Sequence, residues 1–322
     1  MENIIDEFYE NTFNKFNFKK VKNPDKFNSV GECWKIPPEM GEGYYWIYVQ
    51  RNLFDIKIHD FYLNEDRLMT FDWTECLSIT EYESISGEEL SPYRRLSAGC
   101  IKTFVGGYEP YKILIHKKIP IRSIGIEILP EYYEKYLREQ YGADYTNPIS
   151  AFSQIDQTMY FPEVSRRLKE IKNYRGEGIA ARLFYESKVA EIVSLLFEKQ
   201  NSNKNLKEKK LSQQDIKALD DVTAYLNDHY AFEIPTERLA QIACMGKTKL
   251  KSSFKQYHGC TITEYIQRRR MGQAEHLLAK TDLNIGQIAQ TVGYSTSSRF
   301  AELFKKNTGI LPGEYRKFLN NK

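Results

Sequence analysis

The feature that most constrains the fold of this 322-residue chain is an internal repeat in its last third. Residues 254–259 (FKQYHG) recur as residues 304–309 (FKKNTG), and residues 241–243 (QIA) recur as residues 287–289. A repeat at offsets of 46 to 50 residues indicates one structural unit that occurs twice. We therefore expect an all-α domain of two similar halves at 215–322.

Each copy has the pattern of a helix-turn-helix motif. A short apolar-periodic helix is followed by a tight turn that contains Gly246 in the first copy and Gly293 in the second. In such motifs the first helix supports a second, reading helix that enters the major groove of DNA. The second helix carries apolar residues four positions apart, and a tyrosine follows each copy: Leu250, Phe254 and Tyr265, then Phe300, Phe304 and Tyr315.

An amphipathic segment at 262–280 connects the two copies. As a helix its nineteen residues would span about 28 Å, and successive major grooves on one side of B-DNA lie about 34 Å apart. We expect this helix to place the two reading helices in adjacent grooves. The run Arg268–Arg270 lies on it. Three consecutive residues cannot share one helix face, so one or two can reach phosphate while another pairs with an acid or stacks.

Capping residues mark the expected helix ends. Asn284 and Gln287 have the spacing of a capping box. We expect Ser295 to cap the second reading helix, Gly309 to end it, and Thr236 to cap the first helix of the first motif.

Charge is distributed unevenly along the chain. Residues 1–200 hold 26 Lys and Arg against 31 Asp and Glu, whereas residues 201–322 hold 20 against 12. A basic face is what a phosphate-binding surface requires, although a solvated basic face would have the same composition. The excess of positive charge therefore lies in the part of the chain that contains the repeat.

The N-terminal part has a different character, which predicts an α+β protein of more than one domain. We expect a domain at 1–200, a polar linker at 201–214 and the helical domain at 215–322. Residues 56–61 alternate Ile56, Ile58 and Asp60 with Lys57, His59 and Phe61, as a strand does. Turns are expected at 64–67, 86–92 and 106–110. Strands are expected at 45–49, 53–61, 68–71, 77–82, 100–105, 111–115 and 121–128, which favours an antiparallel β-barrel or sandwich.

Helices are expected after Pro130. Pro162 suits the first turn of one helix. A second, at 179–197, is apolar over more than one face, as expected for a helix with two neighbours. The barrel is one neighbour; a second copy of the helix, in a homodimer, or full burial within the domain would account for the other. Ile192 is expected in the dimer contact.

Residues from about 215 to 318 resemble the DNA-binding domain of the AraC/XylS family of transcription regulators. The resemblance rests on LAQIACMGKTKLKSSFKQYHG, YIQRRRMGQAEHLL and IGQIAQTVGYSTSSRFAELFKKNTGILPGEYR. The details KTKLKSSFKQYHG, TITEYIQRRRM and SRFAELFKK look most like the branch of pyochelin-type siderophore regulators. The resemblance implies a cupin-like barrel with dimerisation helices in front of the DNA-binding domain. It also implies double-stranded promoter DNA and RNA polymerase as partners.

The resemblance also implies roles for individual residues. The positions that would face the bases are Thr248, Lys251, Ser252, Ser297, Ser298, Arg299 and Glu302. The positions that would reach phosphates are Lys247, Lys249, Lys255, Arg269, Lys305 and Lys306. Ser252 and Glu302 stand where many members of the family have Arg. Glu302 can accept a hydrogen bond from cytosine N4 or form a salt bridge to Arg299, Lys305 or Lys306.

The alternatives are a metal-dependent cupin-type enzyme and a DNA-repair protein fused to a DNA-binding module. The strand region offers only His59 and His116, without an H-x-H pair, so we expect no metal site and no cofactor. Among the five cysteines, Cys33, Cys76 and Cys100 lack the neighbours of a recognisable repair site. We expect no catalytic residues. The chain has no apolar run of about 20 residues and no signal-like N-terminus, so we expect a cytoplasmic protein without a membrane contact.

Aromatic residues are concentrated in the N-terminal part. It holds all three Trp and seventeen of the 23 Tyr, which either fill a barrel core or line a pocket for an effector. The resemblance suggests an iron-siderophore chelate, and an aromatic metabolite fits the composition equally. The residues expected to line the pocket, chosen because they lie within expected strands, are Trp46, Tyr48, Phe54 and Phe104.

Overall fold

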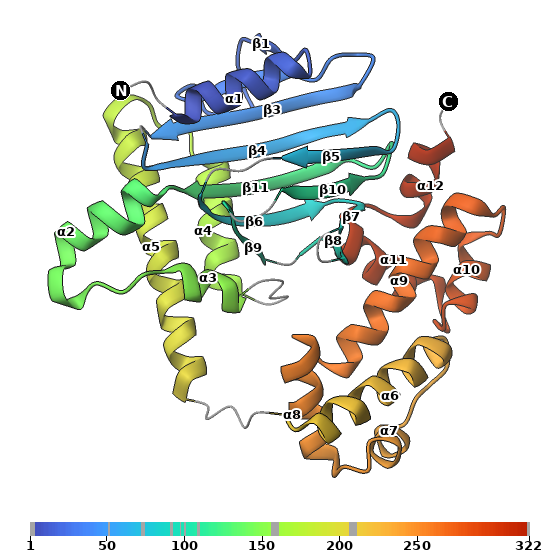
Figure 1. The fold of residues 1–322 in the computed structure, drawn as a ribbon. Coiled ribbons are helices and arrows are strands. Elements are labelled where there is room, and N and C mark those ends of the chain that lie inside the picture. The colour runs from blue at the N-terminus through green and yellow to red at the C-terminus, as the bar shows by residue number, and fades with distance from the viewer. Residues whose placement is uncertain are drawn as a thin grey trace. The chain divides into compact units, whose positions relative to one another are not determined.

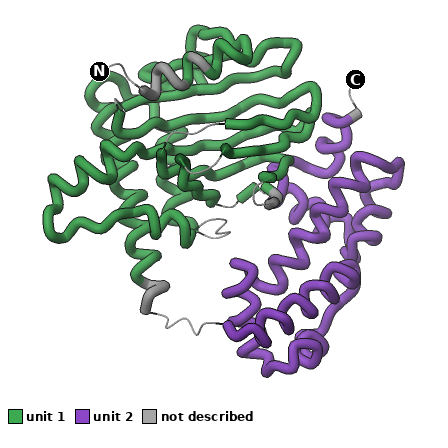
Figure 2. Tube along the Cα trace, in the orientation of Figure 1, with its two compact units in different colours: residues 1–206 green, residues 207–322 purple. Residues whose placement is uncertain are grey.

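The computed structural model describes residues 4–50, 52–71, 75–90, 93–96, 98–99, 101–107, 110–155, 161–205 and 211–320. The chain divides into two compact units, Met1–Leu206 and Lys207–Lys322 (Figure 2). The first contains both sheets and the second contains only helices (Figure 1). Among the described helices, none is long and apolar enough to cross a membrane.

Two antiparallel sheets form the N-terminal unit, in place of the single closed barrel that the strand pattern also allowed. The seven-stranded sheet has the order β1-β2-β3-β4-β11-β6-β9 and the four-stranded sheet the order β5-β10-β7-β8. The first sheet contains β1 (Lys19–Val21), β2 (Glu32–Lys35), β3 (Gly41–Gln50), β4 (Phe54–Leu63), β6 (Leu77–Ser84), β9 (Ile101–Val105) and β11 (Ile121–Ile128). The second contains β5 (Arg67–Phe71), β7 (Gly87–Leu90), β8 (Tyr93–Leu96) and β10 (Tyr111–Ile115).

All seven expected strands are present, and the turn expected at 86–92 is wrong because it contains β7. The sequence of β7, GEEL, lacks the apolar alternation of a half-buried strand. Its two glutamates have polar partners instead: Glu88 lies 2.9 Å from the His116 ring and Glu89 lies 3.0 Å from Lys102. Polar pairing therefore replaces apolar burial on this strand, and an apolar pattern cannot reveal it.

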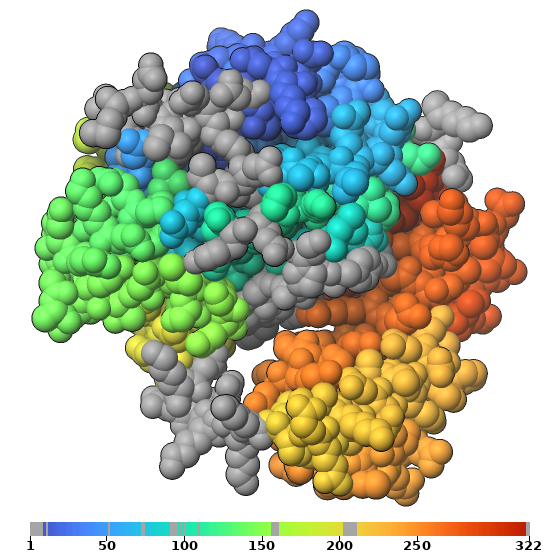
Figure 3. Space-filling model, in the orientation of Figure 1, coloured from blue at the N-terminus to red at the C-terminus, as the bar shows by residue number. Residues whose placement is uncertain are grey.

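Side chains of the seven-stranded sheet alternate between two apolar cores. On β3 and β4, Trp46, Tyr48 and Phe54 face the core that the helices cover. Tyr45 and Phe61 face the core shared with the four-stranded sheet. The helix α1 (Ile4–Lys15), blue in Figure 1, packs onto this second core, where the ring centroids of Phe13 and Trp34 lie 4.6 Å apart. In Figure 3 the first described side chains of the chain are dark blue.

Six helical segments follow β11 among the described residues of this unit, and their buried side chains cover the other face of the sheet. They are the π-helix η1 (Glu131–Tyr136), α2 (Leu137–Tyr141), the 3-10 helix η2 (Gly142–Asp144), α3 (Ile149–Ile155), α4 (Pro162–Asn173) and α5 (Gly178–Asn205). Pro162 occupies the first turn of α4, as expected. The helix α5 continues to Asn205, five residues into the segment that we expected to be a linker.

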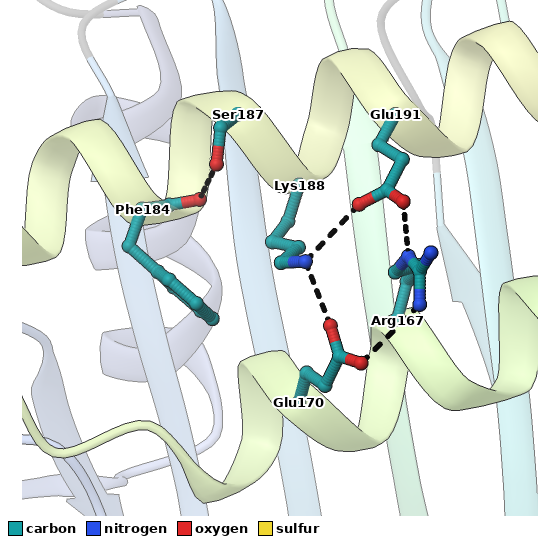
Figure 4. Close-up of polar contacts among 6 residues, drawn as sticks. All are labelled: Arg167, Glu170, Phe184, Ser187, Lys188 and Glu191. Atoms are coloured by element: carbon teal, nitrogen blue, oxygen red, sulfur yellow. Dashed lines mark hydrogen bonds and ion pairs between the residues drawn. The ribbon is translucent and has the colours of Figure 1, made fainter.

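An ion-pair cluster joins α4 to α5 (Figure 4). Arg167 bonds Glu191 and lies 3.2 Å from Glu170, while Lys188 lies 2.7 Å from Glu170 and 3.1 Å from Glu191. These charges lie on the outer side of a contact whose inner side is apolar. Tyr185 and Ile192 of α5 are fully buried in the core on that inner side. The cluster therefore fixes the rotation of α5 against its neighbour.

The C-terminal unit contains seven helices among its described residues. They are α6 (Gln213–His229), α7 (Thr236–Ile242), α8 (Lys247–His258), α9 (Ile262–Lys280), α10 (Ile285–Thr291), α11 (Ser297–Thr308) and α12 (Pro312–Asn320). The connecting helix α9 has the bounds expected from the sequence. The repeat is also structural: Phe254 meets Tyr265 edge-to-face at 5.6 Å, and Phe304 meets Tyr315 in the same way at 5.3 Å.

Two of the expected caps are present and two are wrong. Asn284 and Gln287 form the capping box of α10, and Gly309 ends α11 in the left-handed conformation. The cap of α11 is Thr296 in place of Ser295, because the Thr296 hydroxyl accepts the Arg299 N–H. The cap of α7 is Pro235 with no side-chain bond, so Thr236 is already the first helical residue.

Candidate nucleic-acid interface

The reading helices α8 and α11 each bury one side and expose the other. Leu250 and Phe254 on α8, and Phe300 and Phe304 on α11, are fully buried. The side chains expected to face the bases are all exposed on the opposite sides of these helices: Thr248, Lys251, Ser252, Ser297, Ser298, Arg299 and Glu302. Each helix thus presents a polar surface that a rigid apolar face supports.

Two of the four lysines on α8 are ion-paired within the unit. Lys247 bonds Glu237 of α7, and Lys249 lies 2.7 Å from Asp215 at the start of α6. These bonds hold the pKa of each carboxyl below its usual range. Asp215 also belongs to the capping box of α6, so a DNA phosphate would have to compete with it for Lys249.

The first exposed charged residues of α11 form an ion pair. Arg299 donates to Glu302 at 2.8 Å, and these side chains are 59% and 69% exposed. A salt bridge to Arg299 is one of the two contacts expected for Glu302, the other being a hydrogen bond from cytosine N4. Lys305 and Lys306 are exposed in the last turn of the helix. Without DNA, Glu302 neutralises the arginine nearest the start of the reading helix.

The three arginines of α9 have different surroundings. Arg269 is exposed, with its guanidinium 5.7 Å from the Tyr230 ring. Arg270 donates to the backbone carbonyls of Tyr230, Phe232 and Gly293. The Arg270 guanidinium also lies 5.1 Å from the Tyr294 ring, and Arg268 is half-buried. Stacking of an arginine is thus present as expected, whereas the sequence does not predict the carbonyl contacts of Arg270. An apolar periodicity contains no information about which backbone carbonyls lie beside a helix.

Each helix-turn-helix turn has one residue in the left-handed conformation, and only in the second turn is this residue a glycine. The left-handed position is Cys244 in the first turn, with φ of 49°, and Gly293 in the second, with φ of 88°. Gly246 caps α8 in an extended conformation. From the sequence, each turn was expected to contain a glycine, Gly246 or Gly293, and a glycine is the usual residue at a left-handed position. Cys244 occupies that position here and is exposed.

A second candidate site is a cavity of about 160 Å³ inside the N-terminal unit. Of the four residues expected to line a pocket, only Phe104 lines it. Trp46, Tyr48 and Phe54 do not line it, because they occupy the alternate strand positions, which face the helix-covered core. Most of the other lining residues are aromatic or aliphatic, including Phe13, Phe16, Phe18, Tyr45, Phe61, Phe71, Tyr82, Tyr111, Ile113 and Ile115.

The charged groups of this cavity are paired. Lys57 bonds Glu127, and Lys102 lies 3.0 Å from Glu89. The Tyr9 hydroxyl of α1 donates to Glu127 at 2.9 Å. Burial lowers the pKa of His59 to about 3, so its ring is neutral at physiological pH. The lining of the cavity is therefore mostly apolar, and its two lysines are neutralised by Glu127 and Glu89.

The described part of the chain contains few residues that would suit a metal-dependent enzyme or a repair enzyme. It contains no group of three His, Cys, Asp or Glu placed to hold a metal ion. Burial raises the pKa of the Cys33 thiol to about 11 and that of Cys76 further, whereas a reactive cysteine needs an accessible thiolate. Cys100 lies outside the described residues.

Residues 239–317 match the family described as "Helix-turn-helix domain". The chain is 34% identical over 98 residues to the HTH-type transcriptional activator RhaS of Enterobacter sp. (strain 638), covering 30% of this chain and 35% of RhaS. It is 34% identical over 102 residues to the bifunctional transcriptional activator/DNA repair enzyme AdaA of Bacillus subtilis, covering 32% and 48%. It is 32% identical over 99 residues to the arabinose operon regulatory protein of Salmonella typhimurium, covering 30% and 34%.

These matches agree with the geometry of the C-terminal unit, which contains an AraC-type helix-turn-helix domain. The matched region spans less than half the length of each of these relatives.

Proposed function

We propose that the chain is a DNA-binding transcription regulator that reads two successive major grooves of promoter DNA. The observation that carries the proposal is the pair of reading helices, α8 and α11, each with a buried apolar side and an exposed polar side. The excess of positive charge at 201–322 supports it, because phosphate contacts supply much of the affinity for DNA. RNA polymerase would be the partner at the promoter.

The test is to select duplexes from a random library with the full chain and to measure binding by fluorescence anisotropy. We expect selected duplexes to bind at least about a thousandfold more tightly than an unrelated duplex of equal length. We also expect the logarithm of affinity to fall linearly with the logarithm of salt concentration. Failure to enrich any sequence would contradict the proposal.

We also propose that the cavity of the N-terminal unit binds a small effector. Its size is close to that of an engineered apolar cavity of about 150 Å³ that holds benzene. The size and the aromatic lining favour a compact aromatic metabolite over an iron-siderophore chelate, the other candidate. The paired lysines support an uncharged ligand, since neither is left to neutralise an anion.

The effector proposal is tested by titrating the full chain with aromatic metabolites and with ferric siderophores while tryptophan fluorescence is recorded. Ile113→Trp fills the cavity and should abolish binding of any ligand that the wild type binds. Tyr48→Phe, on the face of the seven-stranded sheet that is turned away from the cavity, is the control and should retain it. No response across the panel, or equal binding by both variants, would contradict a ligand site in this cavity.

A homodimer through α5 is the third part of the proposal. Among the described side chains of this helix, the large apolar ones that are exposed are Ile179 and Leu183, at 71% and 59%. Ile192, which we expected in the dimer contact, is fully buried in the domain core. A charged residue at this position would therefore disrupt folding and would not report on the dimer. Leu183→Glu is the appropriate variant. Sedimentation should show a wild-type dimer and a folded Leu183→Glu monomer; a monomeric wild type at micromolar concentration would contradict the dimer.

We expect no catalytic activity, although the relative AdaA is described as a DNA repair enzyme as well as an activator. Metal analysis of the purified full chain provides the test. A stoichiometric bound metal would favour the cupin-type enzyme instead.

A further inference from the structure

Arg270 connects two segments that belong to different helix-turn-helix halves. Its Nε donates to the carbonyl of Tyr230 at 2.7 Å, and its Nη2 donates to that of Phe232 at 3.1 Å. Both carbonyls lie in the loop between α6 and α7 of the first half. Its Nη1 donates to the carbonyl of Gly293 at 2.8 Å, in the turn between α10 and α11 of the second half. One side chain therefore holds both halves.

The two halves of the domain bury different apolar residues. The apolar core of the first half is built from residues between Leu211 and Ile266, on α6, α7, α8 and the start of α9. The buried aromatic residues of α11 and α12, Phe300, Phe304 and Tyr315, belong to the second half. Each half thus packs on its own part of α9, and an additional contact is needed to fix the angle between them.

Backbone packing at the same point supports this role. A Cβ on Gly293 would overlap the carbonyl oxygen of Ala231, so the second turn lies directly against the first-half loop. The guanidinium of Arg270 also lies 5.1 Å from the centre of the Tyr294 ring. Carbonyls on both sides and an aromatic ring thus surround the same planar group.

We propose that Arg270 is a positioning residue that fixes the separation of α8 and α11, and thereby the spacing between the two DNA segments that they read. The proposal rests on the proposed DNA-binding function. Arginine suits the task because its planar fork of five N–H donors serves several acceptors at once and stacks on rings. A lysine has one ammonium group and cannot hold three carbonyls in this geometry.

The separation can be measured without DNA in the full chain. Spin labels are attached to native Cys244 and to a cysteine introduced by Ser295→Cys, in a Cys100→Ser background. Both labelled positions are exposed, and Cys33, Cys76 and Cys260 are buried. Dipolar spectroscopy should give a narrow distance distribution, which Arg270→Ala widens at least about twofold. His276→Ala, on an exposed position of α9, is the control and should leave the width unchanged.

If Arg270→Ala does not fold, Arg270→Lys is measured in the same way, because it keeps the charge and most of the stem. An unchanged width in a folded Arg270 variant would overturn the proposal. This result does not depend on DNA, so it is distinguishable from failure of the proposed function.

A second readout follows for duplexes selected by the wild type. Inserting about five base pairs, half a helical turn, between the two DNA segments that α8 and α11 read should weaken wild-type binding at least about tenfold. The same insertion should weaken a folded Arg270 variant less than about threefold. Equal penalties for the two proteins would also overturn the proposal, because a purely stabilising role for Arg270 does not alter dependence on spacing.

Discussion

At the scale of single residues, the surface of α8 and α11 differs from a simple basic face. Lys247 and Lys249 are held by acids of neighbouring helices, and Arg299 is held by Glu302. The pairs of Lys247 with Glu237 and of Arg299 with Glu302 are exposed on both sides, and such pairs are worth little, so DNA phosphates can replace these two acids at small cost. The pairs would nevertheless reduce attraction to unrelated DNA, because each cation is partly neutralised before the encounter.

The first prediction concerns Lys255, which is exposed on α8. Lys255→Ala should weaken binding to all duplexes alike and lower the salt slope by about 0.9, the value for one lost phosphate contact. Thr248→Ala and Ser298→Ala should instead change the base preference in a repeated selection. Lys280→Ala, at the far end of α9, serves as a charge-matched control. Equal salt slopes for wild type and Lys255→Ala would contradict the phosphate assignment.

The second prediction concerns the backbone at Cys244. A non-glycine residue in the left-handed region is strained, so Cys244→Gly should raise the free energy of unfolding of the C-terminal unit by about 0.5–1 kcal/mol. Gly293→Ala should lower it, because the added Cβ overlaps the Ala231 carbonyl. Urea denaturation followed by circular dichroism at the helical band measures both. A destabilised Cys244→Gly protein would show that the cysteine side chain has a packing role.

At the scale of elements, the cluster between α4 and α5 makes stability depend on pH. The bonds to Lys188 and Arg167 lower the pKa of Glu170 and Glu191. A carboxyl whose folded pKa lies below its unfolded value stabilises the fold above the unfolded pKa. That contribution is lost as the pH falls through the folded pKa. Acidification below about pH 4 should therefore loosen the contact of α5 with α4.

The third prediction follows from the lowered pKa of Glu191. Glu191→Gln should lower the thermal midpoint of the N-terminal unit at pH 7, and the difference from wild type should vanish near pH 3. Glu139→Gln, on an exposed position of α2, is the control and should have little effect at either pH. Calorimetry at the two pH values measures the difference. An equal destabilisation at pH 7 and pH 3 would mean that packing, and not charge, accounts for the effect.

The elements also show what a sequence can predict. Apolar periodicity located the seven strands and the bounds of α9, because burial on one face governs those segments. It missed β1, β2, β7 and β8, of which β7 carries glutamates that contact Lys102 and His116. Trp46, Tyr48 and Phe54 were expected in the pocket because they lie within strands, and they face the other core. Which of two alternating faces meets the second sheet depends on how the sheets stack. The contacts of Arg270 are likewise tertiary, since they join carbonyls at 230–232 and 293 to a helix between them.

At the scale of the whole molecule, two units of different chemistry share one chain. The N-terminal unit holds an apolar cavity between its sheets, and the C-terminal unit holds two reading helices on one connecting helix. We propose that the first is the sensor and forms the dimer contact, and that the second reads DNA. The segment between α5 and α6 then connects the two functions in sequence.

The central claim is that α8 and α11 read two successive grooves, and hydroxyl-radical footprinting of the full chain on a selected duplex tests it most directly. We predict two protected segments on one face of the duplex, centred about 10 base pairs apart. In Glu302→Arg the protection in one of the two segments should change while the other is retained. A single protected segment of one groove, or protection that follows no fixed register, would contradict the account.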